Sequence, residues 1–293
     1  MRIGAVFPHH DFGNEPEAIT SFVRGVEELG FDHIVAYDHV LGASHENRGH
    51  GLDGPYNETH RFHEVLVLFG YLAAISTTLE LVVGVLVSPQ RQTALIAKQA
   101  AEVQLLSGGR LRLGLGTGWN WVEYGALGAD FDRRGAVLDD QTSVLRALWS
   151  TELVDIDTAH HNIARAGINP LPSKAIPLWF GGYSTAAYRR SALRGDGHIF
   201  GHIDERTGPG VSTLRNFRAE AGLDPSDFGL ETIADIRHDP RHAGDAARNW
   251  RALGGTHLSL RTMPSQGYND PRPLGVDEHL DLLASAIKQA RNY

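Results

Sequence analysis

The polar residues best placed for catalysis form one adjacent pair, Asp38-His39, directly after a short apolar run at 33–37. Histidine is the usual general acid or base near neutral pH. Titratable groups that end a strand of a parallel sheet lie where such sheets bind their ligands. The pattern therefore indicates a proton-transfer site with His39 and Asp38 as candidate catalytic residues. A loop histidine without a chemical role is the alternative that the pattern leaves open.

Two glycine-rich turns follow other apolar runs, Gly116-Thr117-Gly118 and Gly181-Gly182-Tyr183-Ser184. The second turn leads directly into a helical pattern, and the backbone N–H groups of a helix N-terminus bind phosphate well. Ser184 is the predicted N-cap, so it either adds a hydroxyl to a phosphate site or only caps its helix. The first turn is not a G-x-G-x-x-G dinucleotide motif, because position 119 is Trp.

Gly84 interrupts the apolar run 79–87, which otherwise is typical of a fully buried strand. A glycine inside a strand marks a bulge, a close approach by a ligand, or tight packing of neighbouring side chains. The residue types alone do not separate a functional glycine from a structural one at this position.

Two other chemistries have weaker support in the sequence. Gly182-Tyr183-Ser184-Thr185-Ala186 is similar to a hydrolase nucleophile elbow, but its last glycine is missing and His257 lies inside a predicted strand rather than after one. The chain has 16 His but no H-E-x-x-H motif. The adjacent His9 and His10 would point to opposite faces of a strand. We therefore expect no metal site, and a metal-dependent barrel hydrolase remains an alternative.

The elements that must position these residues alternate regularly along the chain. Apolar runs predict buried strands at 2–7, 33–37, 79–87, 110–115, 177–180, 198–200, 230–236 and 257–260. Helical periodicity predicts helices at 15–29, 64–77, 93–106, 133–149, 185–193, 213–221, 243–253 and 277–290. This rhythm favours an α/β fold of the (β/α)8 TIM barrel type over a doubly wound open sheet, and it places the site at the C-terminal ends of the strands.

Composition narrows the class of protein further. We expect one domain over residues 1–293, with insertions at about 42–63 and 151–172 that flank and shape the pocket at the mouth of the barrel. The net charge of −8 argues against nucleic acid, and the absence of Cys excludes disulfides and thiolate chemistry. No apolar run reaches the length of a membrane span. The sequence predicts a cytoplasmic protein with a small-molecule substrate.

Several short motifs occur in a fixed order along the chain. They are Tyr37-Asp38-His39-Val40, Gly84-Val85, Ser88-Pro89-Gln90-Arg91, Ala97-Lys98-Gln99-Ala100, Leu106-Ser107-Gly108-Gly109-Arg110, Gly114-Leu115-Gly116-Thr117-Gly118-Trp119, Glu123-Tyr124, Ala126-Leu127-Gly128, Pro177-Leu178-Trp179-Phe180-Gly181-Gly182 and Gly195-Asp196-Gly197. In this order they resemble the bacterial luciferase-like superfamily of flavin and deazaflavin proteins, and within it the oxidoreductases that use the deazaflavin coenzyme F420. The resemblance covers residues 1–200 well and the last third only by its rhythm.

The resemblance implies that the cofactor lies at the mouth of the barrel, backed by a non-prolyl cis peptide bond at Gly84-Val85. It implies that Asp38 lies near the polar edge of the cofactor ring and that His39 gives or takes a proton. The residues implied in cofactor binding are Asp38, Gly84, Val85, Thr117, Gly118, Gly181, Gly182, Tyr183 and Ser184. The substrate pocket is expected to include His9, Trp119 and Glu123.

One departure from the family pattern bears on the substrate. Sugar-phosphate dehydrogenases of the superfamily carry a carboxylate directly after the Gly-Thr-Gly turn, whereas this chain has Trp119 there, and its nearest acid is Glu123. Lysine is also scarce, with Lys98, Lys174 and Lys288 only. Trp119 puts an apolar wall in place of a general acid, and the scarcity of lysine weakens the case for a phosphorylated substrate.

The resulting hypothesis is an oxidoreductase that transfers a hydride between coenzyme F420 and an unidentified small organic substrate. An FMN-dependent two-component monooxygenase is the alternative within the fold, and a flavin-binding protein without turnover is an alternative of another class. Because no separate dinucleotide motif is present, another enzyme is expected to reduce the cofactor. The resemblance also implies a homodimer.

Overall fold

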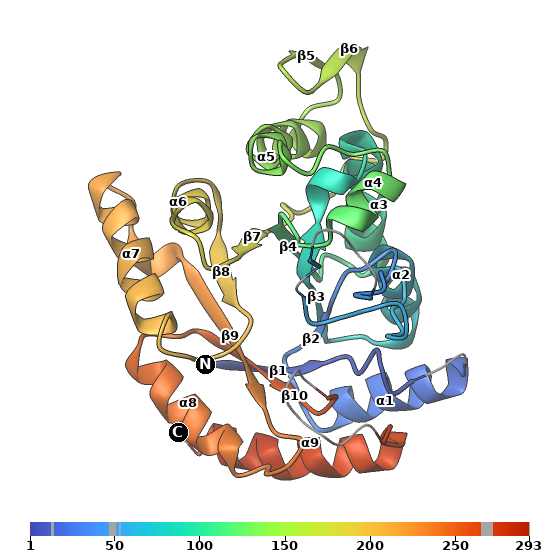
Figure 1. Ribbon diagram of the computed structural model, residues 1–293, viewed down its shortest axis with the longest axis vertical. Coiled ribbons are helices and arrows are strands. Elements are labelled where there is room, and N and C mark those ends of the chain that lie inside the picture. Colours follow the sequence, from blue (N-terminus) through green and yellow to red (C-terminus); the bar gives the residue numbers. More distant parts are fainter. Residues whose placement is uncertain (13–14, 47–50, 53, 265–271, 293) are drawn as a thin grey trace.

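Eight parallel strands close into a barrel in the computed structural model, which describes residues 1–12, 15–46, 51–52, 54–264 and 272–292 (Figure 1). The strands are β1 (Arg2–Val6), β2 (His33–Ala36), β3 (Glu80–Val87), β4 (Leu111–Gly116), β7 (Leu178–Gly181), β8 (Gly197–Phe200), β9 (Gly229–Asp235) and β10 (His257–Arg261). Their order around the barrel is β1-β10-β9-β8-β7-β4-β3-β2. The predicted (β/α)8 TIM barrel is confirmed.

Helices connect the strands and cover the outside of the barrel. They are α1 (Pro16–Glu28), α2 (Val65–Ile75), η1 (Ser88–Gln90), α3 (Thr93–Leu106), α4 (Trp121–Ala126), α5 (Arg134–Ser150), α6 (Thr185–Arg194), α7 (Thr207–Glu220), η2 (Pro225–Asp227), α8 (His242–Ala252) and α9 (Val276–Arg291). Nearly every predicted element lies within two residues of its observed bounds. No helix among the described residues has the length and apolar character needed to cross a membrane.

Two helices differ from the prediction. Helix α7 begins at Thr207 rather than at 213, because Pro209 lies in its first turn, where a missing N–H disturbs no helical hydrogen bond. The short helix α4 was not predicted. The side chain of Asn120 caps it by accepting a hydrogen bond from the N–H of Glu123. This helix matters for function because it carries Glu123.

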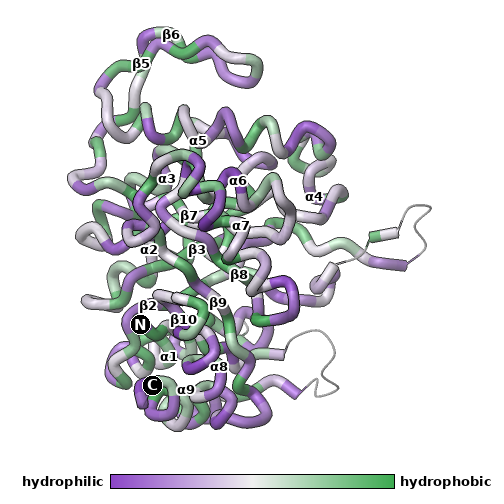
Figure 2. Tube along the Cα trace, turned by 90° about the vertical axis from the view of Figure 1, so that its left-hand side faces the viewer, coloured by the Kyte–Doolittle hydropathy of each residue, from purple (hydrophilic) through white to green (hydrophobic). Residues whose placement is uncertain are grey.

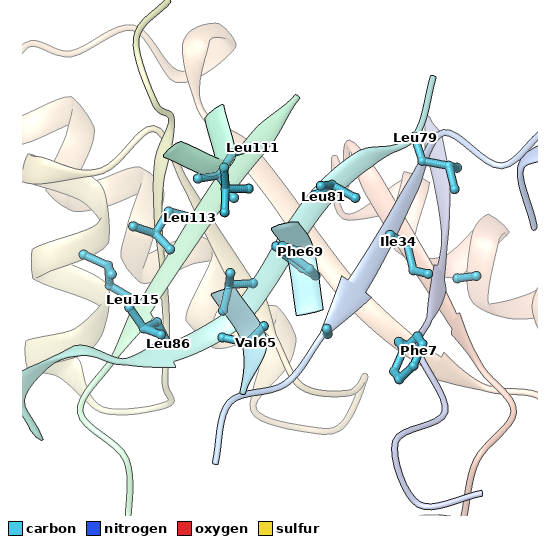
Figure 3. Packing of buried hydrophobic residues seen from close by; sticks show 14 of the residues in the cluster. Phe7, Ile34, Val65, Phe69, Leu79, Leu81, Leu86, Leu111, Leu113 and Leu115 are labelled. Carbon is cyan, nitrogen blue, oxygen red and sulfur yellow. The ribbon is translucent and has the colours of Figure 1, made fainter. Parts of the chain in front are cut away.

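The strands bury both of their faces, as their continuous apolar sequences predict. Their outer faces pack on the helices, and Figure 3 shows Val65 and Phe69 of α2 lying over β3, next to the leucines of β4. Their inner faces form a second, smaller cluster inside the barrel. Its members are Val6, Val35, Tyr37, Val82, Trp179, Ile199, Ile233 and Met263, with Tyr56, Phe62 and Val85 packed against them.

The second predicted insertion forms an antiparallel hairpin of β5 (Val154–Asp157) and β6 (Asn162–Ala166). It packs on the outside of α3 and α5, where the His161 ring bonds Thr93 Oγ1 at 2.6 Å and Asp140 Oδ2 at 2.9 Å. Figures 1 and 2 show it projecting beyond α5. These contacts lie on the outer surface of the two helices, and the expectation that segment 151–172 shapes the pocket stays a prediction.

Candidate active site

A bulge in β3 reaches into the mouth of the barrel. Gly84 and Val85 are joined by a cis peptide bond, as the resemblance implied, and the pairing of β3 with β4 shifts register between Val83 and Leu86. Gly84 and Val85 keep partial exposure, whereas the residues on either side of them are buried. A side chain at Gly116 would place its Cβ only 2.5 Å from Val85 Cγ2. Glycine at that position therefore makes room for the bulge.

His39 and Glu123 form the central polar pair of the mouth. His39 follows the end of β2, and its Nδ1 lies 3.3 Å from Glu123 Oε2. The other carboxylate oxygen of Glu123 accepts hydrogen bonds from the N–H groups of Val40 and Leu41. Burial alone would raise the pKa of Glu123, but the bonds from His39 and from these two N–H groups lower it below its usual value. Glu123 is therefore an ionised acceptor, and it favours the His39 form that carries a proton on Nδ1.

The position of Glu123 is fixed by the first turn of α4. Asn120 Oδ1 accepts from the N–H of Glu123 at 3.2 Å, and Asn120 Nδ2 donates to the carbonyl of Leu41 at 3.1 Å. The helix and the segment after β2 are thereby joined on both sides of the pair. Glu123 is 1% exposed, and its carboxylate contacts the ring of His39. Its place in the substrate pocket stays a prediction.

Aromatic side chains surround the ring of His39. The ring centroids of Phe62, Tyr56 and Trp119 lie 4.9, 5.3 and 5.8 Å from that of His39. Gly54 packs against the Trp119 ring so closely that any side chain there would collide with it. The predicted insertion at 42–63 does cover the mouth in its described part, and it contributes an apolar wall. Residues 47–50 and 53 of this insertion lie outside the described residues.

Asp38 binds protein groups with both of its carboxylate oxygens. Oδ1 accepts from Arg91 Nη2 at 2.5 Å, and Oδ2 accepts from the N–H of Val87 at 2.9 Å. Burial raises the pKa of the Asp38 carboxyl, and Arg91 opposes that rise. Arg91 also pairs with Glu64 at 2.7 Å. Through the bond from Val87, Asp38 thus links the end of β2 to the end of β3, next to the bulge.

His9 lies beneath the mouth and is fully buried. Its Nε2 accepts the N–H of Tyr37 at 3.0 Å, and its ring lies 5.2 Å from that of Phe62. Burial lowers the pKa of His9 well below its usual value, so the ring stays neutral. His9 is in a turn after β1 rather than in a strand. His9 therefore supports the backbone at Tyr37, and its place in the substrate pocket stays a prediction.

The two glycine-rich turns follow β4 and β7 at the same end of the barrel. Gly118 and Gly182 have positive φ angles of 62° and 130°, which glycine adopts without strain. The N–H of Ala187 donates to Ser184 Oγ at 3.1 Å, so Ser184 caps α6. The guanidinium of Arg206 lies 4.3 Å from the centre of the Tyr183 ring. A helix N-terminus with a glycine turn suits a phosphate group, whereas the charge of Arg206 is already paired with Asp204.

Sequence reasoning missed several residues at the mouth. Tyr56 and Phe62 lie in an insertion whose contacts no periodicity reveals. Arg261, Asp235 and Tyr37 point inward from three strands and were given no role. The signal for α4 was present, because Asn120 followed three residues later by Glu123 is a capping pattern.

Among the described residues, no group of three or more His, Asp or Glu side chains is placed to hold a metal ion.

Comparison with known proteins agrees with this fold. The family model of the luciferase-like monooxygenases matches residues 1–280, so the chain belongs to that family, whose members are oxidoreductases. An uncharacterized protein of Mycobacterium tuberculosis is 34% identical over 175 residues, which are 59% of this chain and 60% of the relative. The chain thus matches three-fifths of that relative's length.

Two further similarities span nearly the whole chain. Pyrimidine monooxygenase RutA of Acinetobacter baylyi is 24% identical over 98% of this chain and 80% of its own length. The structure of an F420-dependent secondary alcohol dehydrogenase in complex with an F420–acetone adduct has a TM-score of 0.79 and 16% identity, and the match covers 99% of each chain. The second similarity is one of fold.

Proposed function

We propose that this protein is a coenzyme F420-dependent oxidoreductase that moves a hydride between the deazaflavin and a small organic substrate. The observation that carries the proposal is the His39–Glu123 pair at the mouth, where Nδ1 and Oε2 are 3.3 Å apart. Hydride transfer to or from a carbonyl requires a proton partner, and a histidine oriented by a carboxylate supplies one. The partly exposed bulge at Gly84 and Val85 would be an apolar surface against which a flat ring can pack.

Separate elements of this chain would hold the two ends of the cofactor. Gly84 and Val85 would lie under the ring, and Asp38 would keep the bulge in place through Arg91 and Val87. Thr117, Gly118 and the turn 181–184 would hold the tail and its phosphate. The deazaflavin, when bound, supplies the two-electron hydride chemistry itself.

His39 is the proposed proton carrier. Glu123 accepts the Nδ1 proton, which leaves the lone pair of Nε2 directed away from the carboxylate to take a proton from a substrate hydroxyl. In the reverse direction the imidazolium returns that proton to a substrate carbonyl. Because Arg91 and the N–H of Val87 occupy the oxygens of Asp38, we assign the proton step to His39 alone. Trp119 would form a wall of the substrate pocket beside it.

Titration of the purified protein with coenzyme F420 and with FMN, followed by tryptophan fluorescence, tests the proposal. Trp119 lies beside His39 and should report on binding. We expect micromolar affinity for F420 and weaker binding of FMN. Loss of F420 absorbance on addition of alcohols would then show turnover in one direction. Return of that absorbance when enones or imines are added to reduced F420 would show turnover in the other. Binding without any such change would identify a flavin-binding protein without turnover.

Replacing Ser184 by Ala is expected to weaken F420 binding about fivefold if the hydroxyl contacts the phosphate. The same change removes the N-cap of α6 and should also lower the melting temperature by a few degrees, because a cap contributes about 1 kcal/mol. Fluorescence titration and thermal unfolding measure the two effects separately. A lower melting temperature with unchanged affinity for F420 would mean that Ser184 is only a cap. Ser226→Ala, in a turn far along the chain, is the control.

FMN is the second candidate cofactor, and a two-component monooxygenase is the corresponding function. It is favoured by the similarity to pyrimidine monooxygenase RutA over 98% of this chain. Preference for reduced FMN in the titration above would select this alternative. Either cofactor would be reduced by a separate enzyme.

The outer face of α2 supports a homodimer. Val67 and Tyr71 of this helix are 70% and 41% exposed, and Leu95 of α3 is 50% exposed. The α2 segment VLVLFGYLAAI is apolar on all sides, which is typical of a helix buried on all sides. We propose that a second copy of the chain covers this face, and light scattering would give the mass of the assembly.

A further inference from the structure

A second polar cluster lies at the mouth, separate from His39 and Glu123. Asp235 and Arg261 are the last residues of the neighbouring strands β9 and β10, and they are partners in the register of the sheet. Tyr37 directly follows β2. Each of the three lies two residues beyond a side chain inside the barrel, so all three point inward at its upper end. None of them has a role in the proposed reaction so far.

This cluster contains hydrogen-bond donors that the protein itself does not satisfy. Arg261 Nη2 pairs with Asp235 Oδ2 at 2.6 Å. The Nε of Arg261 and the hydroxyl of Tyr37 are buried, and neither has a hydrogen bond of good geometry to any described residue beyond the contact of these two side chains with each other. In that contact the guanidinium donates to the Tyr37 oxygen, so the Tyr37 O–H itself is still without an acceptor among the described residues. Buried donors in folded proteins are normally bonded, so two unsatisfied donors side by side point to a ligand atom.

The charges of the cluster restrict what that atom can be. Burial alone would lower the pKa of Arg261, but Tyr37 and Asp235 raise it, so the guanidinium stays charged. Burial raises the pKa of Tyr37, which keeps its hydroxyl a donor. The carboxylate of Asp235 offsets the charge of Arg261. Two donors with little net charge fit an uncharged, electron-rich oxygen better than a phosphate or sulfate dianion, which would need unpaired positive charge.

We propose that Arg261 Nε and the Tyr37 hydroxyl form a subsite that binds a carbonyl oxygen of the bound reactant. The inference rests on the proposed function, because both reactants carry such an oxygen. The deazaflavin and FMN each have a pyrimidine dione, and an oxidised substrate such as a ketone has a carbonyl. Both kinds of oxygen gain negative charge when their molecule accepts a hydride. The subsite would therefore bind the reduced reactant at least as well as the oxidised one.

Two conservative variants distinguish the sources of this oxygen. Tyr37→Phe removes only the hydroxyl, and Arg261→Lys keeps the positive charge opposite Asp235 but loses Nε. If the oxygen belongs to the cofactor, each variant should raise the Kd for F420 or FMN about fivefold. If it belongs to the substrate, the Kd should stay unchanged while the affinity of the cofactor-loaded protein for cyclohexanone falls by that factor. Tyr188→Phe, a buried tyrosine on α6, is the matched control.

The proposal fails if both variants keep wild-type affinity, within twofold, for F420, FMN and cyclohexanone with an unchanged melting temperature. Failure of the wild-type protein to bind either cofactor would instead overturn the proposed function. The subsite is then tested without cofactor by saturation-transfer NMR with uracil, a small ring with two carbonyl oxygens. Binding of uracil that depends on Tyr37 supports the subsite, and absence of such binding overturns it.

Discussion

His39→Ala is expected to lower kcat by about 100-fold or more, because general acid–base catalysis by one side chain contributes about 10² to 10⁴. The Kd for the cofactor should stay within twofold of wild type, since the proposed role of His39 is toward the substrate proton. Steady-state kinetics with F420 and an alcohol or ketone substrate measure kcat, and fluorescence titration measures the Kd for the cofactor.

His161→Asn is the matched control, because His161 also bonds a carboxylate, at 2.9 Å, but belongs to the turn of the β5–β6 hairpin. Its kcat should match that of the wild type. Equal losses of kcat and of cofactor affinity in His39→Ala would contradict a specific proton role and would mean that the histidine mainly shapes the cofactor site.

The carboxylate of Glu123, which contacts His39, leads to a second prediction, on the tautomer of the imidazole. In Glu123→Gln, the amide oxygen can still accept from Val40 and Leu41, but the NH₂ group then faces His39 Nδ1. A donor in that place favours the tautomer with the proton on Nε2, so the proton acceptor toward the substrate is lost. The imidazole ¹⁵N shifts of the cofactor-free protein report the tautomer directly. An unchanged tautomer would remove Glu123 from the proposed mechanism.

The barrel could be predicted from the sequence because parallel strands covered on both faces are continuously apolar. The run 79–87 and the helix 93–106 are examples, and the latter has the bounds of α3. The start of α7 could not be predicted in this way, since Gly208, Pro209 and Gly210 have the composition of a loop. Only the packed structure shows that the chain is helical there.

The sequence predicts which strand ends carry the site residues, but not which side chains interact with one another there. Asp38 and His39 follow β2, yet their partners Arg91 and Glu123 are 53 and 84 residues away. One sequence carries no information on such distances beyond the order of its elements. The sequence places Glu123 in the substrate pocket, and only the structure shows that α4 sets it against His39. Arg261 and Asp235 were overlooked because each has the pattern of an ordinary strand end.

The lower layer of the barrel interior supports the mouth through the same strands. Glu231 accepts bonds from Arg112 at 2.5 Å, His33 at 2.8 Å and Ser259 at 2.6 Å, and all four side chains are buried. We expect Glu231→Gln to lower the free energy of unfolding by about 3 kcal/mol, because it leaves a buried guanidinium with less compensation. Urea unfolding measures the loss. Asp245→Asn, in an exposed ion pair on α8, should change it by no more than about 0.5 kcal/mol.

This network also predicts how stability depends on pH. Burial alone would raise the pKa of Glu231, but Arg112 and His33 hold it well below its usual value of 4.5. A carboxyl with a lowered pKa in the folded state stabilises the fold above pH 4.5, and that contribution is lost as the pH falls toward the folded-state pKa. The wild type should therefore lose stability more steeply than Glu231→Gln below that pH. Parallel curves for the two proteins would contradict the prediction. Because Glu231 lies four residues before Asp235 on β9, its loss should also loosen the polar cluster at the mouth.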